Sequence, residues 1–184
     1  PYLLRGNKKS RFGISTGMGF DAGVCQEVLS TPFKKIFNRL GLGKLIYLFI
    51  ALKQIIFISP GKITVTLDGE NTFSYDHVYF TAVMNQKYEG GGFKFCPDAQ
   101  SDDQILDVIL VEGIRKLKLL FCLPTAFFGK HIGIKGIHIF TCKDIHIHSD
   151  AALPIHIDGE SGGIQEDLAV SIEKNSLKII LPVV

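Results

Sequence analysis

The stretch KITVTLDGENTFSYDHVYFTAVMN, residues 62–85, decides the fold class because its side chains follow a period of two. β-branched and aromatic residues stand on both sides of Asp68-Gly69, a dipeptide typical of two-residue hairpin turns. The helical spacing of the preceding segment stops at Pro60. We therefore predict an antiparallel hairpin over these residues.

Segments before Pro60 carry helical signals. Asp21 is a plausible N-cap for a helix over residues 22–29. A second helical stretch is predicted over 31–41, with Pro in its first turn and Gly at its end. Apolar residues at helical spacing predict a third helix over 43–58. Only short, Gly-rich strand pieces are expected in residues 1–19.

Segments after the hairpin are mostly strand-like. A helical candidate over 114–128, bent or broken near Pro124, interrupts them. The predicted class is mainly β: an antiparallel β-sandwich or barrel with helices near the N-terminus and one in mid-chain, forming a single domain over 1–184. The later strands are predicted at 103–113, 136–150, 153–160, 168–174 and 176–184.

Composition narrows the classes of protein. A net charge of +2 and a pI of about 8.5 are too mild to indicate a nucleic-acid partner. Cys25, Cys96, Cys122 and Cys142 form no C-x-x-C pair, so we expect buried thiols in a reducing, cytoplasmic compartment. No signal peptide is recognised. The apolar run at 44–58 is short for a membrane span and contains Lys53, so a packed helix is expected.

Two carboxylates close the strand-like sequence PIHIDGE, residues 154–160. Residues i and i+2 of a strand face the same side, so Asp158 and Glu160 are expected to converge. If both were buried, one would have a raised pKa and could act as a general base near neutral pH. Asp-Gly is also a common turn pair, so the alternative is a hairpin turn with two solvated acids.

An acidic run, SDDQILD at residues 101–107, leads into a predicted buried strand. Hard cations favour oxygen ligands, often one carboxylate with nearby backbone carbonyls. Asp102, Asp103 and Asp107 are therefore candidate ligands for a divalent cation. The alternative is a solvated acidic loop at the start of the strand.

Glycines and histidines provide two further candidates. In YEGGGFKF, residues 88–95, three successive glycines let another group approach the backbone closely, although a flexible turn is the alternative. No nucleotide-binding glycine motif is recognised. His138, His146, His148 and His156 could bind zinc, but their alternation with Ile favours polar positions on half-exposed strands.

The order of these segments is more specific than any one of them. GMGFDAGV (17–24), GLGKLIY (41–47), the block at 84–113 and PIHIDGE (154–160) together resemble the second, C-terminal domain of the diacylglycerol kinase-like lipid kinases. That family includes bacterial diacylglycerol kinases and, more distantly, sphingosine and ceramide kinases. Its pattern of Asn, Tyr-Gly-Gly-Gly, Pro-x-Ala, Asp-Asp-Gly and Leu-Asp is matched by Asn85, Tyr88, Gly90, Gly91, Gly92, Pro97, Ala99, Asp102, Asp103, Leu106 and Asp107.

The resemblance implies a domain of the NAD kinase/diacylglycerol kinase-like fold that transfers the γ-phosphoryl group of ATP to a lipid hydroxyl, with diacylglycerol as the expected lipid. The aspartate matching Asp158 is then the base that takes the hydroxyl proton, with Glu160 beside it. The cleft is implied to involve Asn85 and the glycines Gly90, Gly91 and Gly92. A structural Mg²⁺ is implied at Asp103, with backbone carbonyls matching Ser101 and Leu106.

The chain also departs from the family pattern. Gln86 and Gln104 stand where the family usually has Gly. If position 104 requires a positive φ, Gln costs about 1–2 kcal/mol there. The Gly-Gly-Asp-Gly-Thr loop that holds ATP in the family's first domain does not occur in residues 1–184. We therefore expect a second domain without its nucleotide-binding partner, inactive as an isolated fragment.

Expected partners follow from the resemblance. They are ATP, a lipid alcohol and a second copy of the chain in a homodimer. A membrane surface, at the inner face of the cytoplasmic membrane, is expected to contact FKKIFNRLGLGK at 33–44. Two other functions stay open: a non-catalytic β-sandwich that binds a lipid or other ligand in the Gly-rich cleft, and a small-molecule kinase of the NAD kinase superfamily.

Overall fold

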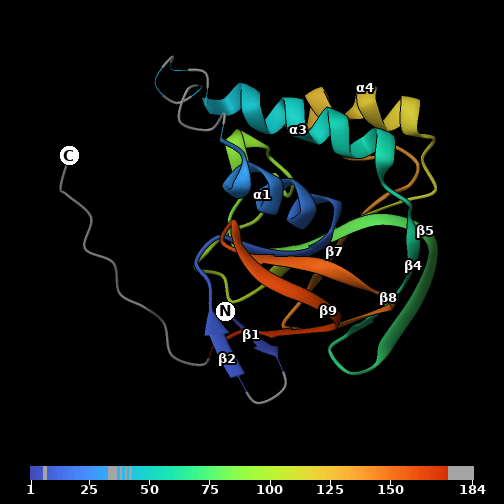
Figure 1. Ribbon diagram of the computed structural model, residues 1–184. Coiled ribbons are helices and arrows are strands. Elements are labelled where there is room, and N and C mark those ends of the chain that lie inside the picture. Colours follow the sequence, from blue (N-terminus) through green and yellow to red (C-terminus); the bar gives the residue numbers. More distant parts are fainter. Residues whose placement is uncertain (6–7, 33–36, 38, 40, 42, 174–184) are drawn as a thin grey trace.

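The computed structural model describes residues 1–184 apart from 6–7, 33–36, 38, 40, 42 and 174–184 (Figure 1). Strands dominate the described chain, and its helices fall in two groups along the sequence. In chain order the elements are β1 (Tyr2–Arg5), β2 (Lys8–Arg11), β3 (Ser15–Gly19), α1 (Phe20–Ser30), α3 (Gly43–Phe57), β4 (Gly61–Leu67), β5 (Asn71–Met84), the 3-10 turn η1 (Gly90–Gly92), β6 (Leu106–Glu112), α4 (Lys116–Ala126), β7 (Ile137–Cys142), β8 (Asp144–Ile157) and β9 (Glu160–Ser171).

All described strands belong to one antiparallel sheet built around two long strands, β5 and β8, of 14 residues each. Two shorter strands lie end to end between them. β3 pairs with both long strands at one end, and β4 pairs with both at the other. The outer strands complete the order β2-β1-β9-β8-β3-β5-β6-β7. The predicted hairpin at 62–85 is confirmed as β4 and β5, turning at Asp68-Gly69.

The sheet curls on itself, as shown by one buried core to which strands from both halves of that order contribute side chains. This core includes Leu3 of β1, Val65 of β4, Val108 of β6 and Leu168 of β9. Sheet twist accumulates over many strands and favours such curling. The prediction of a mainly β, antiparallel domain is confirmed. A β-sandwich is not confirmed, because the described strands form one continuous sheet rather than two facing sheets.

A second core lies between the outer side of the sheet and the helices. Ile109 and Val111 of β6 face this helical side, while Val108 and Leu110 face the inner core. That alternation explains why the sequence of β6 is apolar throughout. In Figure 1, α3 and α4 lie at one end of the molecule, and β1 and β2 lie at the other.

Most predicted helices are confirmed. The predictions over 22–29, 43–58 and 114–128 correspond to α1, α3 and α4, and α4 ends two residues after Pro124. The helix predicted over 31–41 and the strand predicted over 176–184 fall largely or entirely outside the described residues. The assignment of Asp21 as an N-cap is wrong: Gly19 takes that position, and no side chain caps the helix.

Two compositional expectations can also be compared with the structure. Cys25, Cys96, Cys122 and Cys142 are all buried free thiols, as predicted. Among the described helices, none combines the length and the apolar character needed to cross a bilayer.

The inner core predicts a clear difference between two isoleucines. Replacing Ile147 of β8, which has 0% of its surface exposed, by Ala should lower the free energy of unfolding by about 2–5 kcal/mol, because a cavity remains where the side chain was. Ile164 of β9 is exposed, so Ile164→Ala should change stability by less than about 0.5 kcal/mol. Urea melts of the full-length protein measure both. Equal effects would contradict the assignment of the core.

Candidate active site

The candidate site begins at the turn between β8 and β9. Asp158 and Gly159 both have positive φ, 49° and 82°, as in the two-residue turns that match the twist of antiparallel hairpins. Because the turn separates them, Asp158 and Glu160 do not lie on the same strand. The argument that strand spacing makes these two carboxylates converge is therefore wrong. The turn interpretation of the backbone is correct.

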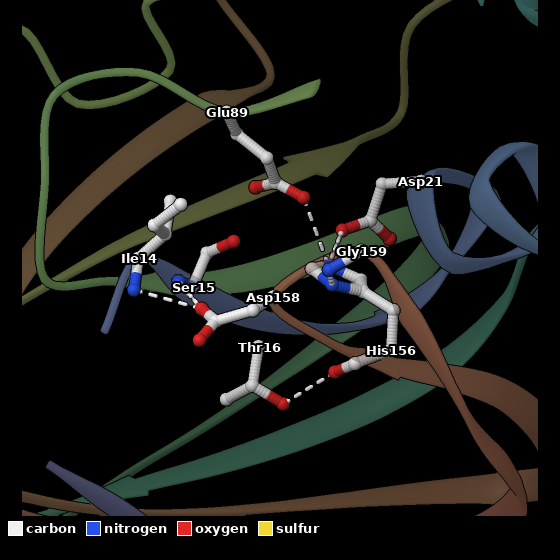
Figure 2. Close-up of polar contacts among 8 residues, drawn as sticks. All are labelled: Ile14, Ser15, Thr16, Asp21, Glu89, His156, Asp158 and Gly159. Atoms are coloured by element: carbon white, nitrogen blue, oxygen red, sulfur yellow. Dashed lines mark hydrogen bonds and ion pairs between the residues drawn. The ribbon is translucent and has the colours of Figure 1, made fainter. Parts of the chain in front are cut away.

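The Asp158 carboxylate binds the backbone of the connection between β2 and β3. Its Oδ2 accepts a hydrogen bond from the Gly13 N–H at 2.8 Å, and its Oδ1 accepts from Ile14 and Ser15 at 2.7 and 3.0 Å (Figure 2). The Asp158 N–H in turn donates to the Ser15 carbonyl at 2.8 Å. A carboxylate offers about four acceptor positions. Three donors therefore leave one position, on Oδ2, for a further group.

A second Asp-Gly turn shows the same arrangement. Asp68, in the turn between β4 and β5, has φ 52°, and its Oδ1 accepts hydrogen bonds from the N–H groups of Lys143 and Asp144. This turn lies at the opposite end of β5 and β8, as the strand pairing requires. Anchoring of a neighbouring backbone is thus a structural role that an aspartate performs twice in this fold.

Asn85 forms hydrogen bonds with the same backbone segment as Asp158, residues 13–15. Its N–H donates to the Ile14 carbonyl at 2.8 Å, and its side-chain Nδ2 donates to the Gly13 carbonyl at 3.0 Å. Two residues that the sequence singled out from distant segments, Asn85 and Asp158, therefore meet at residues 13–15. The donors at 13–15 could not be identified from the sequence, because backbone groups carry no sequence signal.

Glu160 points into a different neighbourhood. It is the exposed first residue of β9, opposite Ile157. Burial and then the neighbouring charges of Glu89, Asp21 and Glu160 raise the pKa of the Cys25 thiol. Burial, Cys25 and Glu160 similarly raise the pKa of Tyr47. Glu160 thus lies on the side of the turn where α1 and α3 pack.

His156 is the central side chain of the buried part of the site. It is completely buried, and its Nε2 lies 3.0 Å from Asp21 Oδ2 and 3.0 Å from Glu89 Oε1 (Figure 2). Both carboxylates are also buried. Among the described residues, one oxygen of each, Asp21 Oδ1 and Glu89 Oε2, has no hydrogen-bond partner. A glycine at position 17 is required, because a Cβ there would collide with Asp21 and with His156 Nε2.

Within this cluster, the His156 imidazole keeps its proton at pH values at which an isolated histidine would release it. Burial alone would lower the pKa of His156, but the Glu89 and Asp21 carboxylates raise it well above 6.5. Burial raises the pKa of Asp21, against the opposing effect of His156. The Gly159 backbone nitrogen lies 3.3 Å from His156 Nδ1, which places the β8–β9 turn next to the cluster.

The expectation that His156 is half-exposed is wrong, and the reason is tertiary. His146, His148 and His156 share one side of β8 by alternation. His146 and His148 stay exposed and contact Asp167 at 3.2 and 3.0 Å, whereas α1 covers the strand at His156. Cys25 is close enough to Glu89 and His156 to complete a set of metal ligands. Burial, followed by the charges of Glu89, Asp21 and Glu160, raises the pKa of the Cys25 thiol, so a metal ion would have to displace the thiol proton in order to bind there.

The conformation of the Gly-rich segment directs the side chain of Glu89 toward His156 and Asp21. Gly90–Gly92 form η1, and backbone hydrogen bonds between Glu89 and Phe93 close the loop at 2.8 and 2.9 Å. A Cβ on Gly90 would lie 3.8 Å from the Tyr47 ring of α3. Sequence reasoning identified the glycines but missed Glu89, although a single carboxylate next to three glycines is an available signal.

The acidic loop at 101–107 forms a separate group. Asp103 Oδ1 accepts a hydrogen bond from the Ile105 N–H at 2.9 Å, and Gln104 adopts the left-handed conformation with φ 60°. Burial, Asp103 and Asp98 raise the pKa of Asp107 to about 6. Asp98, which the sequence did not suggest, therefore belongs to the group. Ser101 precedes Asp103 in the exposed turn, and Leu106 is the first residue of β6.

Comparison with known proteins identifies the class of this domain. Residues 15–181 match the family described as the YegS C-terminal NAD kinase beta sandwich-like domain, and the chain belongs to this family of lipid kinase domains. The resemblance to diacylglycerol kinase-like lipid kinases is thus confirmed.

Individual relatives are consistent with this family. A Bacillus subtilis protein named lipid kinase YtlR is 33% identical over 147 residues, covering 80% of this chain and 47% of the relative. A Mycobacterium tuberculosis H37Rv protein named diacylglycerol kinase is 25% identical over 151 residues, covering 81% of this chain and 45% of the relative. A Bacillus anthracis structure described as a diacylglycerol kinase superposes with a TM-score of 0.62 at 20% identity, covering 91% of this chain and 52% of that one. The chain spans about half the length of these relatives.

The buried cluster predicts how stability depends on pH. In His156→Gln, Asp21 and Glu89 stay buried without their cationic partner, which should cost about 3–5 kcal/mol at neutral pH. Acidification should restore part of this loss, because protonation removes the buried charges. In the wild-type protein the His156 contribution is complete below pH 6.5 and is lost as the pH rises through the raised folded-state pKa. The raised pKa of Asp21 acts in the same direction.

Thermal melts of the full-length protein at several pH values measure these effects. His148→Gln is the matched control, because His148 is an exposed histidine on the same strand that contacts only one carboxylate among the described residues. Its melting temperature should change little. If His156→Gln were as stable as this control at neutral pH, the account of the buried cluster would be wrong.

Proposed function

We propose that this chain is the substrate-side domain of an ATP-dependent lipid kinase that phosphorylates a lipid hydroxyl, with diacylglycerol as the first substrate to test. The observation that carries the proposal is the anchored Asp158 carboxylate. Three backbone donors fix its position, while one acceptor position on Oδ2 stays available. Membership of a family whose relatives are named lipid and diacylglycerol kinases supports the same activity.

The chemistry proposed for Asp158 is to orient the attacking hydroxyl and accept its proton. Phosphoryl transfer depends mainly on positioning and on neutralising charge, so a rigidly held carboxylate suits this role. The hydroxyl would donate to the remaining position on Oδ2, and Glu160 would shape the electrostatic field on the other side of the turn. Asn85 and Gly90–Gly92 would form the adjoining wall, because they hold residues 13–15 and Glu89 in place.

Mg²⁺ is the proposed structural ion at the acidic loop. Burial, together with the nearby carboxylates of Asp103 and Asp98, raises the pKa of Asp107 to about 6, and a cation would relieve the repulsion among these carboxylates. Gln104 keeps the positive φ that glycine would adopt more easily, at a cost of about 1–2 kcal/mol. Asp103, with the carbonyls of Ser101 and Leu106, would hold the ion, whose positive charge would stabilise the loop.

ATP is proposed to bind mainly to a nucleotide-binding domain outside this chain. The relatives are about twice as long as this chain, and residues 1–184 contain no Gly-Gly-Asp-Gly-Thr sequence. The complete kinase would then be a two-domain, cytoplasmic protein that acts at the inner membrane face, and the isolated chain would be inactive. The curled sheet would supply the wall that the sandwich-like domain supplies in the family.

The decisive test of this function uses the full-length protein with ATP, Mg²⁺ and diacylglycerol. Asp158→Asn should lower the turnover number by about 10²–10⁴ if Asp158 acts as a general base. The same change should also lower the melting temperature, because an amide cannot accept from all three backbone donors. Folding controls are therefore essential. Glu160→Gln should fold normally, because Glu160 is exposed.

The outcomes separate the alternatives. Loss of turnover by a folded Asp158→Asn protein supports the role of Asp158 as the general base. Full activity with a lowered melting temperature would reduce Asp158 to the anchoring role that Asp68 performs. A full-length protein that binds lipid but phosphorylates no lipid alcohol would favour the non-catalytic ligand-binding module, and phosphorylation of NAD instead would favour the NAD kinase superfamily.

The metal proposal has its own measurement. Mn²⁺ should bind to the full-length protein without ATP, and Asp103→Asn should weaken this binding at least about tenfold, because a hard cation loses a charged oxygen ligand. Electron paramagnetic resonance of Mn²⁺ measures the bound fraction. Asp150→Asn, at an exposed carboxylate of β8, is the control. Unchanged Mn²⁺ binding by Asp103→Asn would contradict the site.

A further inference from the structure

The buried cluster around His156 contains three kinds of metal-binding group: an imidazole, two carboxylates and a thiol. They belong to His156, Asp21, Glu89 and Cys25, each of which has 8% of its surface exposed or less. The ligand atoms of Cys25, Glu89 and His156 all lie within 4.8 Å of one another. In the described part of the chain, no other group of His, Cys, Asp or Glu brings three ligand atoms so close together. Zinc is bound in proteins by these kinds of side chain.

Helix α1 supplies two of these side chains from one of its sides. Asp21 and Cys25 are four residues apart, so they lie one above the other along the helix. Asp21 Oδ2 lies 3.0 Å from His156 Nε2, which shows that this side of α1 faces β8. Glu89 reaches the same nitrogen from the Gly-rich segment. The cluster thus joins three segments that are distant in the sequence, and an ion that joins distant segments stabilises a fold most effectively.

Two carboxylate oxygens of this cluster lack a partner. His156 Nε2 carries at most one hydrogen, and it lies 3.0 Å from one oxygen of Asp21 and 3.0 Å from one oxygen of Glu89. The other two oxygens, Asp21 Oδ1 and Glu89 Oε2, are buried and have no hydrogen-bond partner among the described residues. Buried carboxylates are normally paired and hydrogen-bonded, because removing their charge from water is costly. A divalent cation would compensate both carboxylates better than a single imidazolium does.

Geometry and donor chemistry together indicate the kind of cation. Bonds of about 2.0–2.3 Å place the ligand atoms of a tetrahedral zinc ion roughly 3.2–3.8 Å apart. The two distances of 3.0 Å at His156 are already close to this range. Mg²⁺ and Ca²⁺ favour oxygen ligands alone, whereas thiolate and imidazole favour Zn²⁺. The thiol of Cys25 therefore distinguishes this cluster from the acidic loop at Asp103.

We propose that Asp21, Cys25, Glu89 and His156 bind one Zn²⁺ ion, which fixes α1 and the Gly-rich segment on β8. The ion replaces the hydrogen on His156 Nε2 and displaces the proton of the Cys25 thiol, and both protons pass to solvent. Coordination deprotonates a thiol outright, which reverses the effect of burial and of the neighbouring carboxylates. The net charge of the cluster does not change, because the two positive charges of Zn²⁺ replace those of two protons.

The zinc site adjoins the candidate base without including it. The backbone nitrogen of Gly159, next to Asp158 in the β8–β9 turn, lies 3.3 Å from His156 Nδ1, whereas the ion binds Nε2 (Figure 2). The Asp158 carboxylate binds the backbone at 13–15 instead. Four protein ligands leave no open position, as in structural zinc sites. Zinc binding requires neither ATP nor lipid, so the zinc site and the proposed kinase activity can fail separately.

The experiment is a titration of the metal-free, full-length protein with Co²⁺, a spectroscopic substitute for Zn²⁺, in the absence of ATP. Bonds between thiolate and Co²⁺ give a charge-transfer band in the near ultraviolet, which the all-oxygen loop at Asp103 cannot produce. The wild-type protein should develop this band and lose it when Zn²⁺ displaces Co²⁺. Cys25→Ser, which nearly keeps the size of the side chain, should abolish the band and weaken Zn²⁺ binding at least about tenfold. Glu89→Gln should weaken Zn²⁺ binding similarly, because a charged ligand is lost.

Matched controls come from outside the cluster. Cys122→Ser removes a second buried thiol, from α4, and His148→Gln removes an exposed imidazole from β8. Both should keep the ultraviolet band and the wild-type affinity for Zn²⁺. Zn²⁺ should also raise the melting temperature of the wild type and of both controls, but not that of Cys25→Ser. The proposal is overturned if the wild-type protein develops no thiolate band, if folded Cys25→Ser retains the band, or if Cys122→Ser loses it equally.

Discussion

The arrangement of the site depends on a buried histidine that lies between two buried carboxylates. His156 comes from β8, Asp21 from α1 and Glu89 from the Gly-rich segment, so one imidazole holds together three segments that are distant in the chain. An unpaired charge at such a depth would cost several kcal/mol, and the three groups can only be buried together. That requirement determines where α1 packs on the sheet and why position 17 must be glycine.

The β8–β9 turn connects this buried cluster to the candidate base. Gly159 approaches His156, while Asp158 binds the backbone at 13–15. The turn at Asp68 shows that the same device also serves the fold alone. What distinguishes Asp158 is therefore its surroundings, since only that turn adjoins Asn85, the glycines and the buried cluster. A structural anchor placed there would also present a carboxylate in a fixed orientation, which is what phosphoryl transfer needs.

The helical layer gives the domain a strong asymmetry of charge. Its inner side completes the second core against β5 and β6, and its exposed aromatic residues belong to sequence segments, 28–67 and 113–143, that contain Lys and Arg but no Asp or Glu. The acidic loop near Asp103 and the turn at Asp158 belong to the remaining, acidic part of the chain.

The sequence by itself determined the main helices, strands and turns. Hydrophobic period distinguished the hairpin at 62–85 from the helix at 43–58, Asp-Gly pairs marked both turns, and the ordered motifs identified the family, because these signals are local. Tertiary structure alone decided which groups meet. His156 is buried because α1 covers one end of β8, Asp158 and Glu160 do not share a strand because a turn lies between Ile157 and Glu160, and Asp98 lies near Asp107 because the loop folds back. The strands form one curled sheet because β3 and β4 share the space between two long strands. Burial and long-range pairing depend on neighbours that no local pattern specifies.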